Sequence, residues 1–345
     1  MKTRVRDIAS RAGVSPATVS NALNGRPGVS QEVTDRIRQL AQEMDYTLPK
    51  GRAEADRNYI RLIVYKSHGL VVMDTPFFAE LIESIQRECQ QAGLELVVNH
   101  MHAGRDANYR ERIREYCQEN CAGILLLGTE MSAEELALFS PSTAPFVVLD
   151  NLFQHEHVHS VVMNNYDAGY IATNALYGYG HRAIEHITSN VSFSNIRYRR
   201  KGYEAAMNSH GLPVSPASLW PVTPTLEGSY RDMLTLLDTG RKVPTAFFAA
   251  NDIMAVGCMR ALAERGYGIP GDVSIIGMDD TSLCLACSPA LTTIRVYRRQ
   301  MGITAVRTLL MLTPDAEDCV LKTQLSVELI ERSSVRTIAP QEDQS

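Results

Sequence analysis

Residues 5–25 read VRDIASRAGVSPATVSNALNG, and this stretch predicts two short helices joined by a tight turn. Apolar residues recur at helical spacing over residues 5–12, and Gly13 follows as a residue suited to end a helix. Ser15 then offers an N-cap, and Pro16 occupies a favourable first helical position. We therefore predict that a second helix begins three residues after the first one ends.

A third, longer helix is predicted in residues 29–46, VSQEVTDRIRQLAQEMDY. Ser30 can cap it, and an apolar stripe of Val33, Ile37, Leu40 and Met44 can bury its inner face. Three short helices with a Gly-containing turn describe a helix-turn-helix module, which inserts its second helix into the major groove of DNA. The helices alone leave open a small protein-binding module as the alternative.

The exposed start of the second helix is the predicted base-reading face. It carries Pro16, Ala17, Ser20 and Asn21. Asparagine can form two hydrogen bonds with adenine, and a small alanine can lie against a thymine methyl group. Hydroxyl and amide groups near helix ends suit contacts with phosphates, and here they belong to Ser15, Thr18, Asn24 and Ser30.

These residues closely resemble the headpiece of the lactose/galactose-repressor (LacI/GalR) family. Its pattern is D-[IV]-A-x-x-A-G-V-S-x-x-T-V-S-x-x-L-N, followed by V-S and a third helix, and residues 7–30 match nearly every position. The resemblance implies a homodimeric transcriptional regulator, by family default a repressor, on a palindromic operator. It places Pro16, Ala17 and Asn21 where the family reads bases, and Thr18, Ser20, Asn24 and Ser30 where it grips phosphates.

Length and composition agree with a protein of several domains in which one part meets an anionic partner. The chain has 345 residues and a formal charge of −5, yet residues 1–26 hold five basic residues and one acid. Seven scattered cysteines indicate reduced thiols, and the charged N-terminus and short apolar runs give no signal peptide or membrane span. We expect a cytoplasmic protein.

From residue 60 onward, short apolar runs such as IRLIVY, AGILLLG and DVSIIGMDD alternate with helical stretches. This alternation is typical of buried parallel strands in an α/β fold. Such a sheet binds ligands at the carboxyl ends of its strands, where Asp150, Asn251 and Asp279 follow apolar runs. A ligand site at that edge is predicted.

The same region resembles the family's effector-binding core, which is similar to periplasmic sugar-binding proteins, with two α/β lobes around a cleft. The matching motifs are N-D-x-M-A-x-G, V-S-x-x-G-[YF]-D-[DN] and G-H-x-x-I. We expect a headpiece at 1–48, a linker at 49–59 and a core at 60–340. Lobe one takes about 60–158 and 293–320, and lobe two takes about 159–292 and 321–340.

The resemblance implies an effector in the cleft. Aromatic rings would stack on it, carboxylates would accept from paired hydroxyls, and an arginine and an amide would bind its polar edge. The candidates are Phe78, Asp150, Arg199, Tyr230, Asn251 and Asp279. A sugar is favoured, while a purine or a sugar phosphate fits nearly as well.

The linker departs from the family's Y-x-P-N-x-x-A-R-x-L, a hinge that wedges its leucine into the minor groove. Here residues 46–59 read YTLPKGRAEADRNY. Aligned on Pro49, Asp56 replaces the leucine, and aligned on Tyr46, Ala55 takes that place. We therefore expect a tether without the wedge.

Three other patterns carry no site. Cys284 and Cys287 form a single C-x-x-C, Gly178 and Gly180 belong to a G-x-G-x-x-A that follows a helix, and residues 155–159 read HEHVH in a predicted loop. Residues 196–201, IRYRRK, predict a solvated helix start that presents Arg199 to the cleft.

We predict no cofactor, no metal and no catalytic residue, since the sequence contains no nucleophile elbow, P-loop or zinc signature. The rival interpretations are a cytoplasmic sugar or nucleobase receptor without a DNA-binding role and, third, an enzyme on the same scaffold. The headpiece pattern argues against both.

Overall fold

The computed structural model describes residues 5–23, 29–44, 46, 58–72, 76–312 and 319–338. Contacts divide the chain into two compact units, Met1–Asn58 and Tyr59–Ser345. Each is described here by itself.

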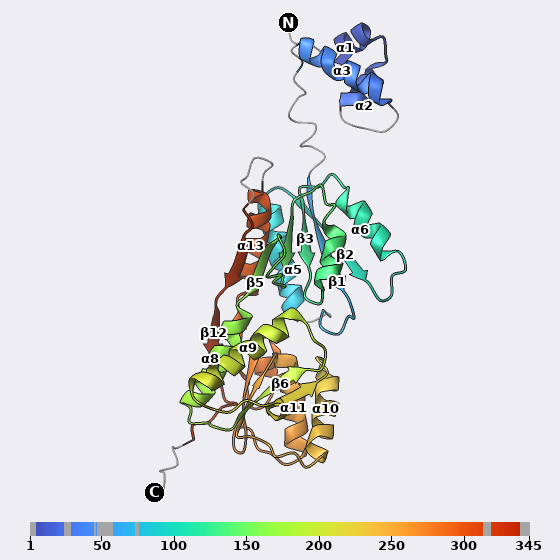
Figure 1. Ribbon diagram of the computed structural model, residues 1–345. Coiled ribbons are helices and arrows are strands. Elements are labelled where there is room, and N and C mark those ends of the chain that lie inside the picture. The colour runs from blue at the N-terminus through green and yellow to red at the C-terminus, as the bar shows by residue number, and fades with distance from the viewer. Residues whose placement is uncertain are drawn as a thin grey trace. The chain divides into compact units, whose positions relative to one another are not determined.

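The first unit is the predicted trio of helices, α1 (Val5–Ala12), α2 (Pro16–Leu23) and α3 (Gln31–Glu43) (Figure 1). Gly13 adopts φ +70° after α1, a left-handed backbone that favours glycine. The Ser15 hydroxyl accepts from the backbone N–H of Thr18 at 3.1 Å and so caps α2. A small apolar core holds the trio together, and its buried members are Ile8, Ala9, Val19, Ala22, Ile37 and Ala41.

The second unit has two lobes, each built on a six-stranded sheet. The sheet of lobe one is parallel throughout and runs in the order β11-β5-β4-β3-β1-β2. Its strands are β1 (Tyr59–Lys66), β2 (Glu95–His102), β3 (Gly123–Leu127), β4 (Phe146–Leu149), β5 (His159–Met163) and β11 (Lys322–Leu325). Its helices are α5 (Pro76–Gln91), α6 (Tyr109–Cys117), α7 (Ala133–Leu136), η1 (Ala137–Phe139) and α13 (Arg298–Met311).

The sheet of lobe two runs in the order β12-β10-β9-β8-β6-β7, and only β12 pairs antiparallel. Its strands are β6 (Ile184–Ser189), β7 (Leu219–Val222), β8 (Ala246–Ala249), β9 (Ser274–Asp279), β10 (Thr292–Val296) and β12 (Val327–Ile330). Its helices are α8 (Asn165–Gly178), α9 (Ser194–Ser209), η2 (Pro216–Ser218), α10 (Leu226–Asp238), α11 (Asp252–Glu264) and α12 (Leu283–Ala286).

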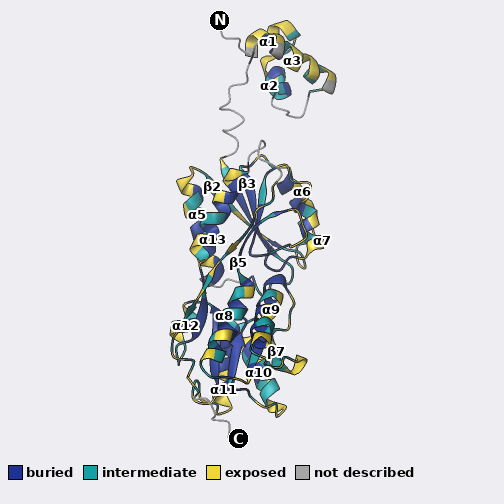
Figure 2. Cartoon of the chain, turned by 60° about the vertical axis from the view of Figure 1, so that its left-hand side comes forward, coloured by how far each residue is buried: buried dark blue, intermediate teal, exposed yellow. Residues whose placement is uncertain are grey.

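Helices cover both faces of each sheet, so the central strands are buried (Figure 2). All five residues of β3 and all four of β8 are buried, which explains why these segments read as continuous apolar runs. No helix in the described ranges is both long and apolar enough to span a bilayer. The predicted two-lobed α/β core with an N-terminal helix-turn-helix unit is confirmed.

The chain crosses between the lobes three times, at slightly different places from those predicted. Residues 159–163 pair within the sheet of lobe one as β5, residues 292–296 pair within lobe two as β10, and residues 322–325 return to lobe one as β11. The predicted boundaries at 158, 293 and 320 therefore each assign a strand to the wrong lobe. An apolar run predicts a strand but does not say which sheet will pair with it.

Candidate functional site

The N-terminal face of α2 is open, as a base-reading face requires. Pro16 and Ala17 are exposed, while Val19 and Ala22 turn into the core. Ser20 and Asn21 are half-buried at the edge of the same face. The first turns of the helix thus present the predicted side chains.

Three of the predicted phosphate-contacting groups, Ser15, Thr18 and Ser30, lie at helix starts. Ser15 bonds to the Thr18 hydroxyl at 2.9 Å, and Ser30 accepts from the N–H of Val33 at the start of α3. Asn24 lies outside the described residues, as does most of the predicted tether 49–59. Asn58 and Tyr59 at its end are described, and Tyr59 already begins β1.

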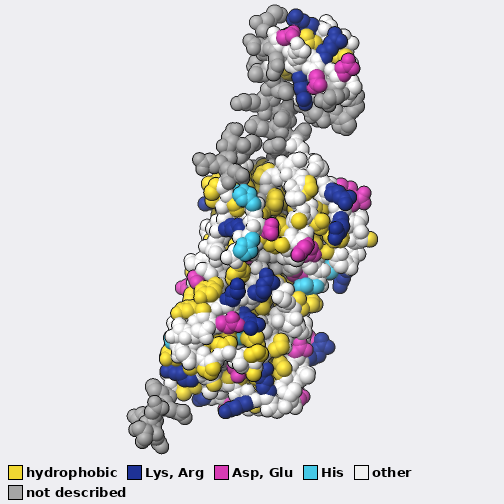
Figure 3. All heavy atoms as spheres, in the orientation of Figure 1, with side chains coloured by type: hydrophobic (Ala, Val, Ile, Leu, Met, Phe, Trp, Pro, Cys, Tyr) yellow, Lys and Arg dark blue, Asp and Glu magenta, His cyan; other side chains and the backbone are white. Residues whose placement is uncertain are grey.

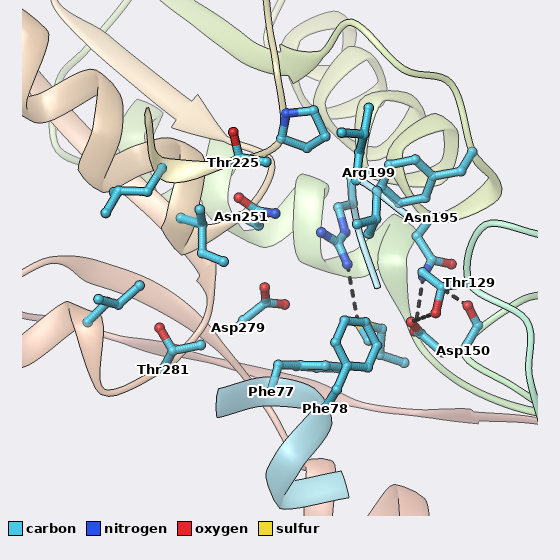
Figure 4. Close-up of a pocket in the computed structure, with 18 residues that line it drawn as sticks. Phe77, Phe78, Thr129, Asp150, Asn195, Arg199, Thr225, Asn251, Asp279 and Thr281 are labelled. Carbon is cyan, nitrogen blue, oxygen red and sulfur yellow. Dashed lines mark hydrogen bonds between the residues drawn. The ribbon is translucent and has the colours of Figure 1, made fainter. Parts of the chain in front are cut away.

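A cavity of about 350 Å³ in the second unit collects five of the six predicted effector residues. Asp150, Asn251 and Asp279 reach it from the ends of β4, β8 and β9, Phe78 from the first turn of α5, and Arg199 from α9. Figure 4 shows these side chains converging from both lobes. The carboxyl ends of parallel strands thus meet at this cavity, as the topology predicts.

Arg199 is the positive centre of the cavity. It is buried, and its guanidinium donates to Asn165 Oδ1 at 2.8 Å and to the carbonyl of Ala250 at 2.6 Å. These bonds fix the planar fork, so the charge is held in place before any ligand arrives.

Two carboxyl groups of the cavity, the buried Asp150 and the half-buried Asp279, hold protons more readily than usual. Burial raises the pKa of Asp150 to about 6, although the Thr129 hydroxyl, the charge of Arg199 and the Asn195 amide each oppose the rise. Burial also raises the pKa of Asp279, again against the charge of Arg199. Carboxyls with raised pKa values in a cleft are frequent in functional sites.

Tyr230 does not belong to this cavity, so its predicted stacking role is wrong. It lies on α10, where its hydroxyl donates to Glu264 and Arg260 lies 4.0 Å from its ring centroid. The cavity reaches only the start of α10, where Leu226 lines it, and Tyr230 lies one helical turn further along.

Several polar lining residues were not predicted from the sequence, among them Thr129, Asn195, Thr225 and Thr281. Thr129 donates to Asp150 Oδ2 at 2.7 Å, and Asn195 donates to Asp150 Oδ1 at 3.0 Å. Thr281 is oriented by Asp252, which accepts both its N–H and its hydroxyl. Small polar residues that follow strands are the signal that could have found them.

Comparisons with known proteins agree with this arrangement. A model of bacterial regulatory proteins of the lacI family matches residues 4–48, and a periplasmic binding protein-like domain matches residues 173–335. The chain is 31% identical over 342 residues to the HTH-type transcriptional repressor PurR of Haemophilus influenzae, covering 97% of this chain and 99% of that protein. The chain belongs to the LacI family.

Two solved structures share the fold. A LacI family transcriptional regulator from Enterococcus faecium with bound ribose is 25% identical, with a TM-score of 0.68, and the match covers 81% of this chain and all of that one. The Lac repressor dimer bound to operator and the anti-inducer ONPF is 23% identical, with a TM-score of 0.71 and coverage of 97% and 100%. The relatives of this LacI-family chain are repressors and not enzymes, as expected from its sequence.

The patterns set aside in the sequence have structural roles. The cysteines are free, and the Cys287 thiol faces the carbonyls of Cys284 and Pro289. Gly180 follows α8 with φ +91°, where a Cβ atom would lie 2.2 Å from the carbonyl oxygen of Ile338. Among the described residues, no three His, Cys, Asp or Glu side chains cluster as a metal site.

A buried carboxylate holds one wall of the cavity. Glu130 accepts the backbone N–H groups of His68, Gly69, Val71 and Val72 at 2.8–3.0 Å. Burial alone would raise the pKa of Glu130, but these N–H bonds outweigh it and lower that pKa. The loop after β1 is therefore fixed, and its Leu70 and Val71 line the cavity.

Glu130→Gln should lower the affinity for the effector about tenfold and the free energy of unfolding by roughly 2–4 kcal/mol. The glutamine NH₂ faces two of the four N–H groups and leaves them without acceptors, so the loop loosens. Effector titration by calorimetry and thermal unfolding would measure the two effects. Glu134→Gln, an exposed change nearby, is the control, and unchanged effector affinity in Glu130→Gln would contradict the positioning role.

Proposed function

We propose that this LacI-family chain is a cytoplasmic repressor that binds a palindromic operator as a homodimer and responds to a small effector in the interlobe cavity. The observation that carries the proposal is that five predicted effector residues share one cavity in a chain that also carries an open α2 face. An effector can act only through different affinities for two arrangements of the protein.

The cavity favours a donor-rich ring. The carboxylates of Asp150 and Asp279 are acceptors, and Asn251 already uses its oxygen to accept the N–H of Met254, which leaves its NH₂ for a ligand. Phe77 and Phe78 pack edge to face and offer an apolar surface. We propose a sugar, whose paired hydroxyls match the carboxylates; the ribose in the Enterococcus faecium relative supports this class.

A nucleobase is the second candidate. The specific observation is the apolar lining, in which Phe77, Phe78 and Phe193 are joined by Leu70, Val71, Ile253 and Leu283. A flat ring with N–H groups can stack on such walls and still donate to the carboxylates. Thermal unfolding with a panel of sugars and nucleobases distinguishes them, since a ligand raises the melting temperature only if it binds the folded state.

Exchanging Ala17 and Asn21 for other side chains should change operator preference. A base contact that a substitution removes or adds alters discrimination by about 1–3 kcal/mol, whereas phosphate contacts, and thus the salt dependence of binding, stay nearly unchanged. Binding-site selection followed by salt titration measures both. Gln39→Ala, which changes an exposed residue of α3, is the control. If neither substitution on α2 alters the operator preference, Ala17 and Asn21 do not read bases.

A small-molecule receptor without a DNA-binding role is the rival from another class. It would require a protein that binds no DNA sequence more tightly than random duplex, either with or without effector. The same selection experiment decides this, because a repressor recovers a two-fold symmetric site.

A further inference from the structure

A second cavity of about 430 Å³ lies behind the wall of the effector cavity. Phe193 lines both cavities. Neighbouring residues divide between them, because Asp150 and Asn195 line the first while Asn151 and Ser194 line the second. The two cavities thus share a wall made by the β4–β5 connection and the start of α9.

One stripe of α9 faces the second cavity. Ser194, Arg197, Tyr198 and Lys201 all line it, and their spacing of three, four and seven residues puts them on one helical face. Arg197 and Lys201 are exposed, and within the described part of the chain neither forms an ion pair. Lys and Arg side chains gather on the face drawn in Figure 3 at the level where the lobes meet. His155 adds an imidazole to the rim.

The hydroxyl of Ser194 opens into the cavity and has no partner among the described residues. Its residue is only 7% exposed, and its hydroxyl forms no hydrogen bond within the described residues, although it lines the cavity. It also begins α9, a helix of 16 residues whose N-cap, Phe193, supplies no side-chain cap. The first N–H groups of an uncapped helix require an acceptor, and the Ser194 hydroxyl is a further donor beside them.

The two acids of this cavity balance its two cations in formal charge, but the buried acid is already saturated with hydrogen-bond donors. Glu130 and Glu156 line it, but both oxygens of Glu130 accept backbone N–H groups, and Glu156 is exposed. The cations that line the same cavity are Arg197 and Lys201. Orphan N–H groups at a helix start, two cations and a hydroxyl form the donor set that suits a phosphate group.

We propose that this second cavity binds a phosphate group, free or carried by a small metabolite, at the N-terminal stripe of α9. The site is separate from the effector cavity and does not depend on which effector binds there. Because Phe193 belongs to both cavities, occupation of the phosphate site changes the affinity for the effector, and by linkage the effector changes the affinity for phosphate equally.

Calorimetric titration of the full chain with inorganic phosphate, at constant ionic strength set with chloride, tests this site. We expect saturable binding that weakens about tenfold in Arg197→Gln and in Lys201→Gln, since each loses a charge-assisted hydrogen bond. Ser194→Ala should weaken it several-fold. All three variants should unfold at the wild-type temperature without phosphate, because the first two side chains are exposed and the third has no partner.

Arg200→Gln is the matched control, since Arg200 lies on the same helix, is exposed, and pairs with Glu204 instead of lining the cavity. Its affinity for phosphate should equal that of the wild type. Titration with glycerol 3-phosphate shows whether the site prefers a phosphate carried by a metabolite, and glycerol is its phosphate-free control. Binding of glycerol 3-phosphate that is tighter than that of inorganic phosphate supports a phosphorylated metabolite. Binding that is no tighter supports phosphate itself. An absence of saturable binding, or an equal loss in Arg200→Gln, would overturn the site.

Discussion

Arg199→Ala should abolish the response to the effector and leave operator binding without effector intact. The guanidinium is the fixed positive centre of the cavity, and its charge lowers the pKa of both Asp150 and Asp279, so its loss removes both a ligand contact and their charge balance. We expect effector affinity to fall at least about 100-fold, because a charged and geometrically fixed donor is removed. Effector titration and operator binding with and without effector would measure this.

The same substitution should also destabilise the core. It leaves the Ala250 carbonyl and Asn165 without the donor they bond now, and truncating one partner of a buried charge arrangement costs about 3–5 kcal/mol. Arg199→Lys separates the loss of effector affinity from the loss of stability, because lysine keeps the positive charge but lacks the planar guanidinium with its several fixed donors. The lysine variant should stay folded yet bind effector at least about tenfold more weakly. Arg200→Ala is the control, and wild-type effector affinity in Arg199→Lys would refute the assignment.

The fold was largely predictable because its local signals agree. Capping by Ser15, Pro16 at the first helical position and the apolar runs of the strands all indicate the elements that form. The crossing points were not predictable, since β10 is followed after one residue by α13 in the other lobe. Strand pairing is a long-range property, and local composition does not encode it.

The cavity was predictable where a residue ends a strand, and less so on helices. Asp150 and Asp279 could be placed because each ends a parallel strand, and ligands bind at the carboxyl ends of such strands in both sheets. Tyr230 failed because it lies one helical turn, about 6 Å, beyond Leu226 on α10, and the cavity reaches only the start of that helix.

The second cavity has only the run IRYRRK as its signal in the sequence. That run predicts a solvated helix start that presents Arg199 to the cleft, and Arg199 is indeed buried there. Arg197 and Lys201 line a separate hollow instead. A run of cations does not show which of them share a cavity, because that depends on the loop of the other lobe that packs against the helix.

Asp150→Asn should stabilise the effector-free protein at pH 7.5 while weakening effector binding. The ordinary pKa of an aspartate is about 3.9, whereas burial raises the pKa of Asp150 to about 6. The folded state therefore binds the proton more tightly, so this residue's contribution to stability is fully present below about pH 4 and is lost as pH rises through about 6. A rise of roughly two pKa units corresponds to about 3 kcal/mol at pH 7.5.

Asparagine fits the site and has no buried carboxyl group that must ionise at pH 7.5. Its Oδ1 can accept from Asn195 and its NH₂ can donate to the Thr129 hydroxyl, so the two bonds that hold Asp150 now are kept. The backbone at this position has φ 58°, which asparagine tolerates well. We expect the variant to gain about 1–3 kcal/mol at pH 7.5 and little at about pH 4.

Urea unfolding of both proteins at pH 4, 6 and 7.5 measures the gain, which includes a smaller rise in the pKa of Asp279 once the charge of Asp150 is removed. Effector affinity should fall about 100-fold, because the ligand's donors lose a charged acceptor. Thr129→Val is the companion variant: it removes the hydroxyl that lowers the pKa of Asp150, so the pH at which stability is lost should move upward. If Asp150→Asn is instead less stable than the wild type at pH 7.5, then the ionised carboxylate is held favourably by Arg199 and its neighbours, and the cavity stabilises negative charge before any effector binds.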